Sequence, residues 1–502
     1  MTRNKAKWLL LSFVILFGFI YLFTYLPYSN DGPRGIHQWA QSDRIAICMR
    51  FIEGKSLNDP ATLSMKTTDG NTGVEFSGYQ YIIAQIIRMG VSQDYLFIIY
   101  RLLTFSIFFS SFFLLLFNVL DKEKILYRIF IFLGLISSPI LLYYGYNFLP
   151  DILGLSLLLV CFYFFHKDFE KYFYHILIIS GLALLIKTSS GIYFISFMAI
   201  YFLKYWNKWN KKLVLGGTIF LVIGGGVFYY DYFLVNLRNK EFNSYVFLSG
   251  TMPARSWAEF LQIFDTASRF TSEYFNGAQR TLIALLSVIG LFRLKDLHFE
   301  NIHTQLGILV GLGLLAILIL FGVQYMNHDY YVIATFMPIL IYFVIKGTAY
   351  LSQYIHPHTS LVIAAIFAVI SFSLGNQKYF NRMSEIVWVN GYPEYYERNW
   401  AVNAAQKIEP YVPKDALVFS VYSPEPNFAL VYFNRKGATF NTEEMQRGDS
   451  PFTWFLKYLD TKYVICYSRF TNQFNKDNPN FVTNAKVLYT DDQFTLYEKD
   501  GH

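Results

Sequence analysis

The chain has 502 residues, of which 54% are hydrophobic and only 15% are charged, whereas a soluble domain carries about 25% charged residues. This composition excludes an ordinary soluble enzyme and predicts an integral membrane protein. The net charge is +7, but the basic residues gather in short loops between apolar runs, which does not indicate nucleic-acid binding. Three cysteines without metal-ligand spacing predict no disulfide framework.

Apolar runs of membrane-spanning length recur along the first three quarters of the chain. About 20 apolar residues cross the hydrocarbon core as a helix, so the sequence predicts about eleven transmembrane helices. They are expected at residues 8–26, 95–118, 125–144, 150–165, 173–189, 191–205, 213–230, 280–294, 305–325, 330–346 and 360–376. The first run follows a basic start without a small-residue cleavage site, which predicts a retained helix rather than a removed signal peptide.

Basic residues indicate the orientation, because cytoplasmic loops are enriched in lysine and arginine. They mark the N-terminus and then every second loop, including Lys122, Lys124 and Lys204, whereas the opposite short loops hold almost none apart from Lys187. The N-terminus is therefore predicted to be cytoplasmic. An odd number of helices then places the residues after about 377 outside.

The chain divides into a transmembrane domain, residues 1–376, and an extracytoplasmic tail, residues 377–502. The external loops of the transmembrane domain are 27–94 and 231–279. Interfacial helices are expected in the first loop, from Trp39 onward and over Tyr79–Met89. The tail predicts a small α/β domain, with a helix at Glu394–Lys407, a turn at Asp491–Asp492, and strands at Ala416–Tyr422, Lys462–Cys466, Lys486–Tyr489 and Phe494–Glu498. The predicted fold is thus a polytopic all-α membrane domain plus a small α/β domain.

Polar residues collect in five strings on the predicted outer face. They contain His37 and Asp43; Glu75 and Tyr79; Asp151; Lys187; and His328, Asp329 and Tyr330. Each has an ordinary explanation, such as a helix cap, a first-turn acid or an interfacial tyrosine. Taken together, carboxylates, histidines and a lysine at one level predict a site for acid/base chemistry near the lipid headgroups.

Four short motifs occur in order along residues 8–350. They read HQWAQSD, EFSGY, LPD and HDYY. In this order they resemble the C-type (GT-C) superfamily of membrane glycosyltransferases. The resemblance is strongest to the bacterial relatives of protein O-mannosyltransferases and of the aminoarabinose transferase that modifies lipid A. Three positions depart from the family pattern: Arg44 replaces a glutamate, Ser77 replaces a proline, and Phe76 replaces a phosphate-binding lysine.

The resemblance implies an inverting transfer of a hexose or pentose from a polyprenyl-phosphate donor to a glycan, lipid or protein acceptor of the cell envelope. Asp43 would be the catalytic base. The substrate-binding candidates are His37, Glu75, Tyr79, Asp151, Lys187, Arg255, Arg269, His328, Asp329 and Tyr330. A divalent metal is left open, with Glu75 and His328 as candidate ligands. The expected location is the bacterial inner membrane, with the tail holding the acceptor or shielding the site.

Other functions share parts of this pattern. A transporter or lipid flippase would need polar or broken helices at mid-membrane, and the glycines at 216, 217 and 224–226 are the main evidence for it. Their alternative explanation is close helix packing. A polysaccharide polymerase or ligase and a non-catalytic scaffold for the tail are further alternatives.

Overall fold

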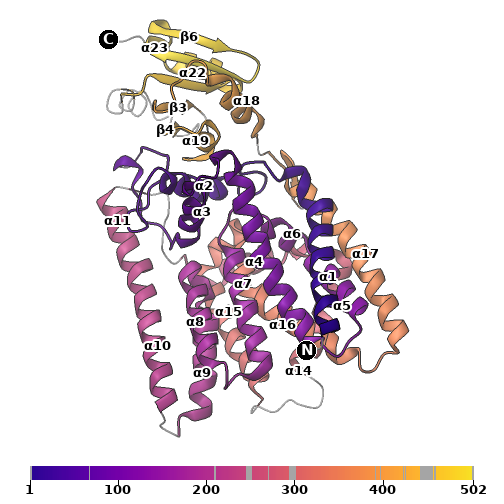
Figure 1. Cartoon of the computed structure of the whole chain (residues 1–502). Coiled ribbons are helices and arrows are strands. Elements are labelled where there is room, and N and C mark those ends of the chain that lie inside the picture. The colour runs from indigo at the N-terminus through magenta and orange to yellow at the C-terminus, as the bar shows by residue number, and fades with distance from the viewer. Residues whose placement is uncertain are drawn as a thin grey trace.

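The protein consists of a helical bundle and a small sheet domain above one end of it (Figure 1). The N-terminus lies at the end of the bundle away from this domain (Figure 1). The computed structural model describes residues 3–66, 68–207, 211–242, 244, 252–269, 271–292, 301–389, 392–395, 397–421, 423, 425–440, 456 and 460–499.

Each of the eleven predicted spans coincides with helical structure in the described part of the chain, although residues 293–294 of the eighth lie outside it. The helices are α1 (Arg3–Ile20), α4 (Leu96–Val119), α5 (Ile125–Ile136) with α6 (Pro139–Gly145), α7 (Asp151–Asp168), α8 (Phe173–Ile186), α9 (Gly191–Tyr205), α10 (Lys211–Phe228), α14 (Gly277–Phe292), α15 (Ile302–Asn327), α16 (Tyr331–Leu351) and α17 (Pro357–Arg382).

Not all of these helices are long enough to cross a bilayer alone. Within the described residues, six helical segments are long and apolar enough, or seven if α5 and α6 form one bent span. The other helices are shorter or carry more charge. The chain is therefore an integral membrane protein, with fewer full-length candidate spans than the eleven predicted.

The third predicted span is broken rather than continuous. Helices α5 and α6 meet at an angle of 82°. Ser138 has an extended backbone (φ −64°, ψ 136°), and Pro139 is the first residue of α6. A residue before proline avoids the helical conformation, and proline fits the first turn of a new helix. The Ser138–Pro139 pair therefore sets the break.

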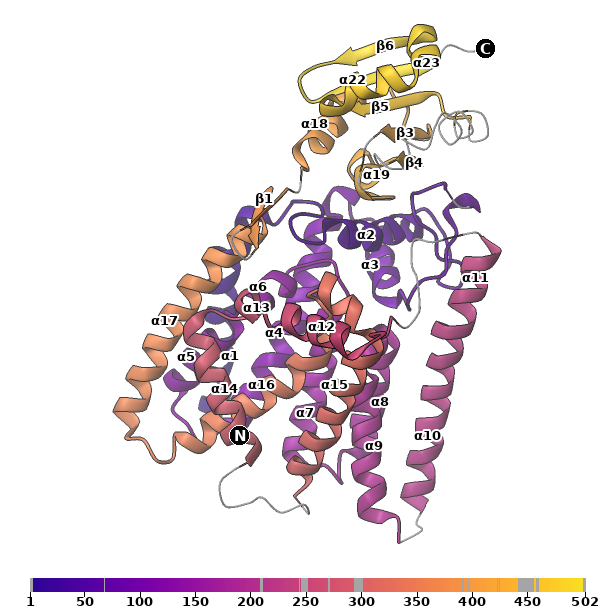
Figure 2. The ribbon, with the colours of Figure 1, turned by 180° about the vertical axis from the view of Figure 1, so that it is seen from behind.

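The first external loop forms α2 (Gln38–Ile52) and α3 (Gly78–Arg88), which lie across the end of the bundle beneath the tail (Figures 1 and 2). The two predicted helices are confirmed as helices. Nearly every residue of α2 is buried, including Asp43 and Arg44. A helix that lay on the membrane surface would have an exposed face. Helix α2 has none, so it is enclosed between the bundle and the tail rather than lying on the membrane surface. The second external loop contains α11 (Val235–Glu241), α12 (Trp257–Arg269) and α13 (Thr271–Tyr274).

The tail contains a five-stranded sheet in the order β4-β3-β5-β7-β6. Strand β3 pairs in parallel with β4 and β5, and β7 pairs antiparallel with β5 and β6. The elements are β3 (Val418–Val421), α19 (Phe428–Phe433), β4 (Gly437–Phe440), β5 (Tyr463–Tyr467), α22 (Ser468–Asp477), α23 (Pro479–Asn484), β6 (Ala485–Thr490) and β7 (Phe494–Lys499).

The predicted strands of the tail are confirmed, although Tyr422 lies outside the described residues. The turn before β7 is also confirmed, because the Asp491 carboxylate accepts the backbone N–H groups of Gln493 and Phe494 at 2.8 and 2.9 Å. The helix predicted at Glu394–Lys407 begins later than predicted. Residues Tyr392–Tyr395 form β2, which pairs with β1 (Ile386–Val389), and α18 spans only Asn399–Ile408. Proline 393 lacks the N–H that a helix interior uses, which favours the strand there.

One hydrophobic core joins the first external loop to the tail. It combines Ile45 and Ile47 of α2 with Trp400, Phe428 and Ile465 of the tail. Backbone pairing adds to it, because Met65 N–H donates to Gly437 O at 2.6 Å and Gly437 N–H donates to Leu63 O at 3.1 Å. The tail is therefore packed on the loop that carries Asp43.

Candidate functional site

Asp43 lies in α2, with only 4% of its surface exposed. Its Oδ1 accepts a hydrogen bond from Nδ2 of Asn427 at 2.8 Å. Burial raises the pKa of Asp43 to about 7; the hydrogen bond from Asn427 acts in the opposite direction, and the nearby Glu425 adds to the increase. A carboxyl group with a pKa near neutrality can exchange protons at physiological pH, as a general base must.

Next to Asp43, four charged side chains form one ion cluster. Glu75 Oε2 lies 2.7 Å from Nη2 of Arg44, and Glu75 Oε1 lies 3.3 Å from Nζ of Lys187. The same Nζ lies 3.4 Å from Oδ1 of Asp151. The structure thus brings together Glu75, Asp151 and Lys187, which the sequence predicted at one level, and adds Arg44.

Helix ends place the members of this cluster. Asp151 begins α7 directly after Pro150, where the helix dipole favours an anion, and Lys187 follows the last residue of α8, where it favours a cation. Burial alone would raise the pKa of Glu75, but Lys187 and Arg44 outweigh it and lower this pKa to about 2. Glu75 is therefore ionised at neutral pH.

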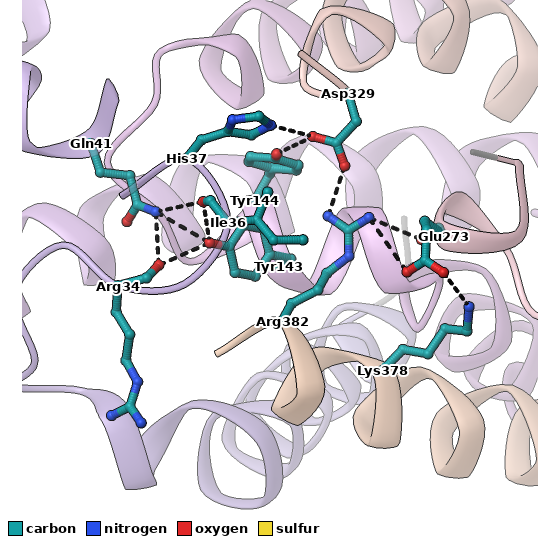
Figure 3. Close-up of polar contacts among 10 residues, drawn as sticks. All are labelled: Arg34, Ile36, His37, Gln41, Tyr143, Tyr144, Glu273, Asp329, Lys378 and Arg382. Atoms are coloured by element: carbon teal, nitrogen blue, oxygen red, sulfur yellow. Dashed lines mark hydrogen bonds and ion pairs between the residues drawn. The ribbon is translucent and has the colours of Figure 1, made fainter. Parts of the chain in front are cut away.

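A second network surrounds Asp329 (Figure 3). Its Oδ1 lies 3.2 Å from His37 Nε2 and also accepts the hydroxyl of Tyr144. Its Oδ2 lies 2.8 Å from Nη1 of Arg382. Arg382 also forms an ion pair with Glu273: Nη2 of Arg382 lies 4.0 Å from Oε2 of Glu273. Burial opposes ionisation of Asp329, but Arg382 and His37 hold its pKa below the usual range.

His37 has a left-handed backbone, with φ 56° and ψ 32°, directly before α2. Such a conformation is uncommon outside glycine and needs support from its surroundings. Support comes from the preceding residue, because Ile36 O accepts the hydroxyl of Tyr143 at 2.6 Å and Nε2 of Gln41 at 3.1 Å (Figure 3). The imidazole is thereby held against Asp329.

An aromatic group connects the two networks. The ring of Tyr330 lies 5.0 Å from that of His37 and is stacked on that of His328 at 5.4 Å. Nζ of Lys187 lies 5.6 Å from the same Tyr330 ring, a cation–π distance. The ring of Trp39 lies 5.5 Å from His328. Seven of the predicted residues therefore belong to one continuous polar and aromatic network with Arg382 at its far side: His37, Glu75, Asp151, Lys187, His328, Asp329 and Tyr330.

One candidate metal ligand, Glu75, is already engaged by two cations. Both oxygens of Glu75 already face cations, which disfavours a further cation there. Among the described residues, no three His, Cys, Asp or Glu side chains are arranged to hold a metal ion.

Two predicted substrate residues, Tyr79 and Arg255, are not brought into these networks by any described contact. The hydroxyl of Tyr79 bonds to Thr104 and to the Tyr100 carbonyl on α4, at 2.9 and 3.2 Å. Arg255 is exposed, and its backbone N–H donates to Glu259 at 2.5 Å. The side chain of Arg269 lies outside the described residues.

Four residues of this site were not predicted from the sequence: Arg382, Glu273, Tyr144 and Asn427. Arg382 carried a usable signal, because a basic residue at the outer end of the last helix runs against the charge bias, as Lys187 does. Asn427 carried none, since it stands 384 residues from the carboxylate that it contacts.

No protein-family model matches this sequence, and no curated protein sequence matches it. Solved structures match the fold of this chain. ArnT from Cupriavidus metallidurans in the apo state is 12% identical, with a TM-score of 0.62 over 98% of each chain. The same protein bound to undecaprenyl phosphate is 10% identical, with a TM-score of 0.59 over 99% of this chain and 98% of that one.

The archaeal oligosaccharyltransferase AglB from Archaeoglobus fulgidus, in complex with an inhibitory peptide and a dolichol-phosphate, is 9% identical. Its TM-score is 0.56 over 93% of this chain and 70% of that one. These structures are GT-C glycosyltransferases. At such identities the similarity concerns the fold, and it confirms the GT-C-like architecture that the motifs predicted.

Proposed function

We propose that this protein is an inverting glycosyltransferase that moves a sugar from a polyprenyl-phosphate donor to a cell-envelope acceptor at the outer face of the membrane. One observation carries the proposal: a buried carboxylate with a near-neutral pKa, Asp43, stands beside Arg44, and Arg44 belongs to an ion cluster that Tyr330 connects to the Asp329 network. The residues involved come from predicted external segments or from the predicted outer ends of transmembrane helices. Helix α2, which carries Asp43, lies on the side of the bundle that the tail covers (Figure 1).

In the proposed reaction, the acceptor hydroxyl gives its proton to Asp43 as its oxygen attacks the anomeric carbon. A new glycosidic C–O bond forms on one face of the sugar, while the C–O bond to the phosphate breaks on the other. The polyprenyl phosphate leaves with the bonding electrons, so the anomeric centre is inverted. A positioned base contributes about 10² to 10⁴ in rate.

The leaving phosphate needs donors that are already in place. Lys187 has three N–H donors, and its ion pairs with Glu75 and Asp151 use two of them, which leaves one for a phosphate oxygen. The aminoarabinose-type enzymes that the motifs resemble carry a lysine after the glutamate, where this chain has Phe76. Lys187 reaches Glu75 from another helix and thus offers a lysine at the same carboxylate. Arg44 adds a second cation.

The neighbours of this fold support the proposed donor and location. An ArnT structure holds undecaprenyl phosphate, and the AglB structure holds dolichol-phosphate, which supports a polyprenyl-phosphate donor here. We place the protein in the bacterial inner membrane, with the N-terminus in the cytoplasm and the tail outside. The termini lie toward opposite ends of the bundle, in keeping with this orientation (Figure 1).

Replacing the base tests the proposal. We expect Asp43→Asn to abolish sugar transfer, measured by mass spectrometry of cell-envelope glycans from cells that produce wild type, variant or neither. The matched control is Asp94→Asn, which removes an exposed carboxylate that bonds to Ser92. Normal glycans in cells with a well-produced Asp43→Asn protein would disprove the base assignment.

One observation favours the transporter or flippase alternative: the sharp break between α5 and α6, since broken helices bind substrates in transporters. The break itself presents Ser137 and Ser138, neither of which is charged, whereas the charged residues of the two ion networks lie on other elements. In reconstituted vesicles, a flippase would move a fluorescent polyprenyl phosphate from one membrane leaflet to the other without forming a glycan. A glycosyltransferase would form the glycan.

A further inference from the structure

The loop between β3 and α19 brings a tail residue to the proposed catalytic base. Asn427 follows Glu425 in this loop and is fully buried. Its amide nitrogen donates to Asp43 at 2.8 Å, so a residue far along the chain from α2 completes the surroundings of the base.

The orientation of the Asn427 amide is defined by a second bond. Its Oδ1 accepts the backbone N–H of Ser64 at 3.0 Å. A backbone N–H can only donate, so the oxygen must face Ser64 and the NH₂ group must face Asp43. This removes the usual ambiguity of an asparagine amide and makes Asn427 a donor to the carboxylate.

The surrounding packing keeps Asn427 in register with Asp43. Residues Leu63 and Met65, on either side of Ser64, exchange backbone hydrogen bonds with Gly437 at the start of β4. A side chain at Gly437 would collide with the backbone, since a Cβ there would lie 1.8 Å from Val418 O. Residues 63–65 of the first external loop, β4 and α19 thus form one rigid frame around the amide.

We infer that Asn427 is a positioning residue for Asp43, so that the C-terminal domain contributes directly to the catalytic centre rather than only shielding it. The inference rests on the proposed function, because it assigns the role of a tail residue to the same base. A donor on Oδ1 fixes the carboxylate rotamer and leaves the other oxygen for the acceptor hydroxyl.

The charge state of Asp43 supplies a readout that a purely structural role would not change. An N–H donated to a carboxylate favours its ionised form. The charged groups that act on Asp43 are Arg44 from its own helix, which also favours ionisation, and Glu425 from the tail, which disfavours it. Loss of Asn427 and loss of Glu425 should therefore move the titration of Asp43 in opposite directions.

The experiment is an infrared pH titration of the full-length protein in detergent, which follows the protonated carboxyl band that Asp43→Asn removes. We expect Asn427→Ala to shift the midpoint upward by about one to two pH units, the effect of losing one hydrogen bond to an ionised group. Glu425→Gln should shift it downward. Tyr432→Phe is the control, because it removes a tail contact to Pro33 without touching Asp43.

A second variant, Asn427→Asp, keeps the test informative if Asn427→Ala does not fold. Asn427→Asp keeps the side-chain volume and the acceptor for Ser64 but replaces the donor with an acid, so it should shift the midpoint upward at least as far. Unchanged midpoints in Glu425→Gln and in a folded Asn427 variant would overturn the inference. If the midpoints shift as expected but Asp43→Asn still transfers sugar, the proposed function fails while the contact stands.

Discussion

At the residue scale, Asp43 places function and stability in opposition. An aspartate in an unfolded chain has a pKa of about 3.9, and burial raises that of Asp43 to about 7. Between these values the folded protein binds more protons than the unfolded one, so the stability associated with this group is present at low pH and is lost as the pH rises through 7.

We therefore predict that Asp43→Asn, although inactive, is more stable than wild type at pH 8. Its amide oxygen can still accept the bond from Asn427, and no charge is buried. The advantage should widen by about 3 kcal/mol between pH 5 and pH 8, followed as the difference in melting temperature in detergent. Asp94→Asn should show no such dependence. A pH-independent difference would contradict the raised pKa.

Arg382 connects two buried carboxylates, Asp329 and Glu273, with only 1% of its side chain exposed. Removing one partner of a buried ion pair leaves an uncompensated charge and costs about 3–5 kcal/mol. We predict that Arg382→Gln lowers the melting temperature strongly. Lys378→Gln is the comparison, because Lys378 pairs with Glu273 from a position where 32% of its side chain is exposed. Equal losses in both variants would show that burial does not decide the effect.

At the element scale, helices α14 and α16 approach each other through two glycines. A Cβ at Gly290 would lie 1.9 Å from Phe343 O, and one at Gly347 would lie 2.0 Å from Leu286 O. Small residues of this kind let helix backbones meet in membranes. The contact orients α16, whose first residues follow Asp329 and Tyr330 at the site.

We predict that Gly347→Ala separates α14 from α16 and lowers both the melting temperature and the sugar-transfer rate. Gly225→Ala on α10 is the matched control, because nothing lies within 4 Å of a Cβ at Gly225 and alanine favours a helix over glycine by about 1 kcal/mol. The control should be neutral or stabilising. A loss of stability from Gly225→Ala as large as that from Gly347→Ala would argue against close packing as the cause.

The glycines that the sequence analysis singled out behave differently from the expectation of close packing. On α10, a Cβ at Gly216 would contact Phe173, but positions Gly217, Gly225 and Gly226 face open space. The sequence shows where glycine occurs. Whether a glycine allows two helices to pack closely depends on which helix lies opposite it. The pair at Gly290 and Gly347 could not be found from the sequence, because neither position differs locally from the α10 glycines.

At the scale of the whole molecule, the sequence predicted what depends on local periodicity. Apolar runs located the helices, and short β-like runs located β3, β5, β6 and β7, whereas β1, β2 and β4 were not predicted. Pairings between distant segments could not be predicted, since nothing near Asn427 refers to Asp43 and nothing near Arg382 refers to Asp329. Lys187 was an intermediate case: its unusual side of the membrane marked it as notable, but its partners Glu75 and Asp151 emerged only from the fold.

The same distant pairings determine how the tail is held. Besides the shared core, Arg398 Nη2 lies 3.1 Å from Asp31 Oδ1, and the Tyr432 hydroxyl donates to Pro33 O. The loop that receives them is itself anchored, because Arg101 of α4 donates to the carbonyls of Tyr28 and Asp31 at 2.7 and 2.6 Å. Docking of the tail therefore depends on its contacts with the first external loop and not on the covalent connection to the last helix of the bundle.

We predict that the tail stays bound when the chain is cut. A protease site inserted between Val389 and Tyr392, the paired ends of β1 and β2, would sever the tail after the last bundle helix. Both fragments should elute together in size-exclusion chromatography, and transfer should persist, because Asn427 would still reach Asp43. Adding Arg398→Gln and Tyr432→Phe should release part of the tail. Immediate separation of the cut wild-type fragments would show instead that the covalent connection holds the catalytic centre together.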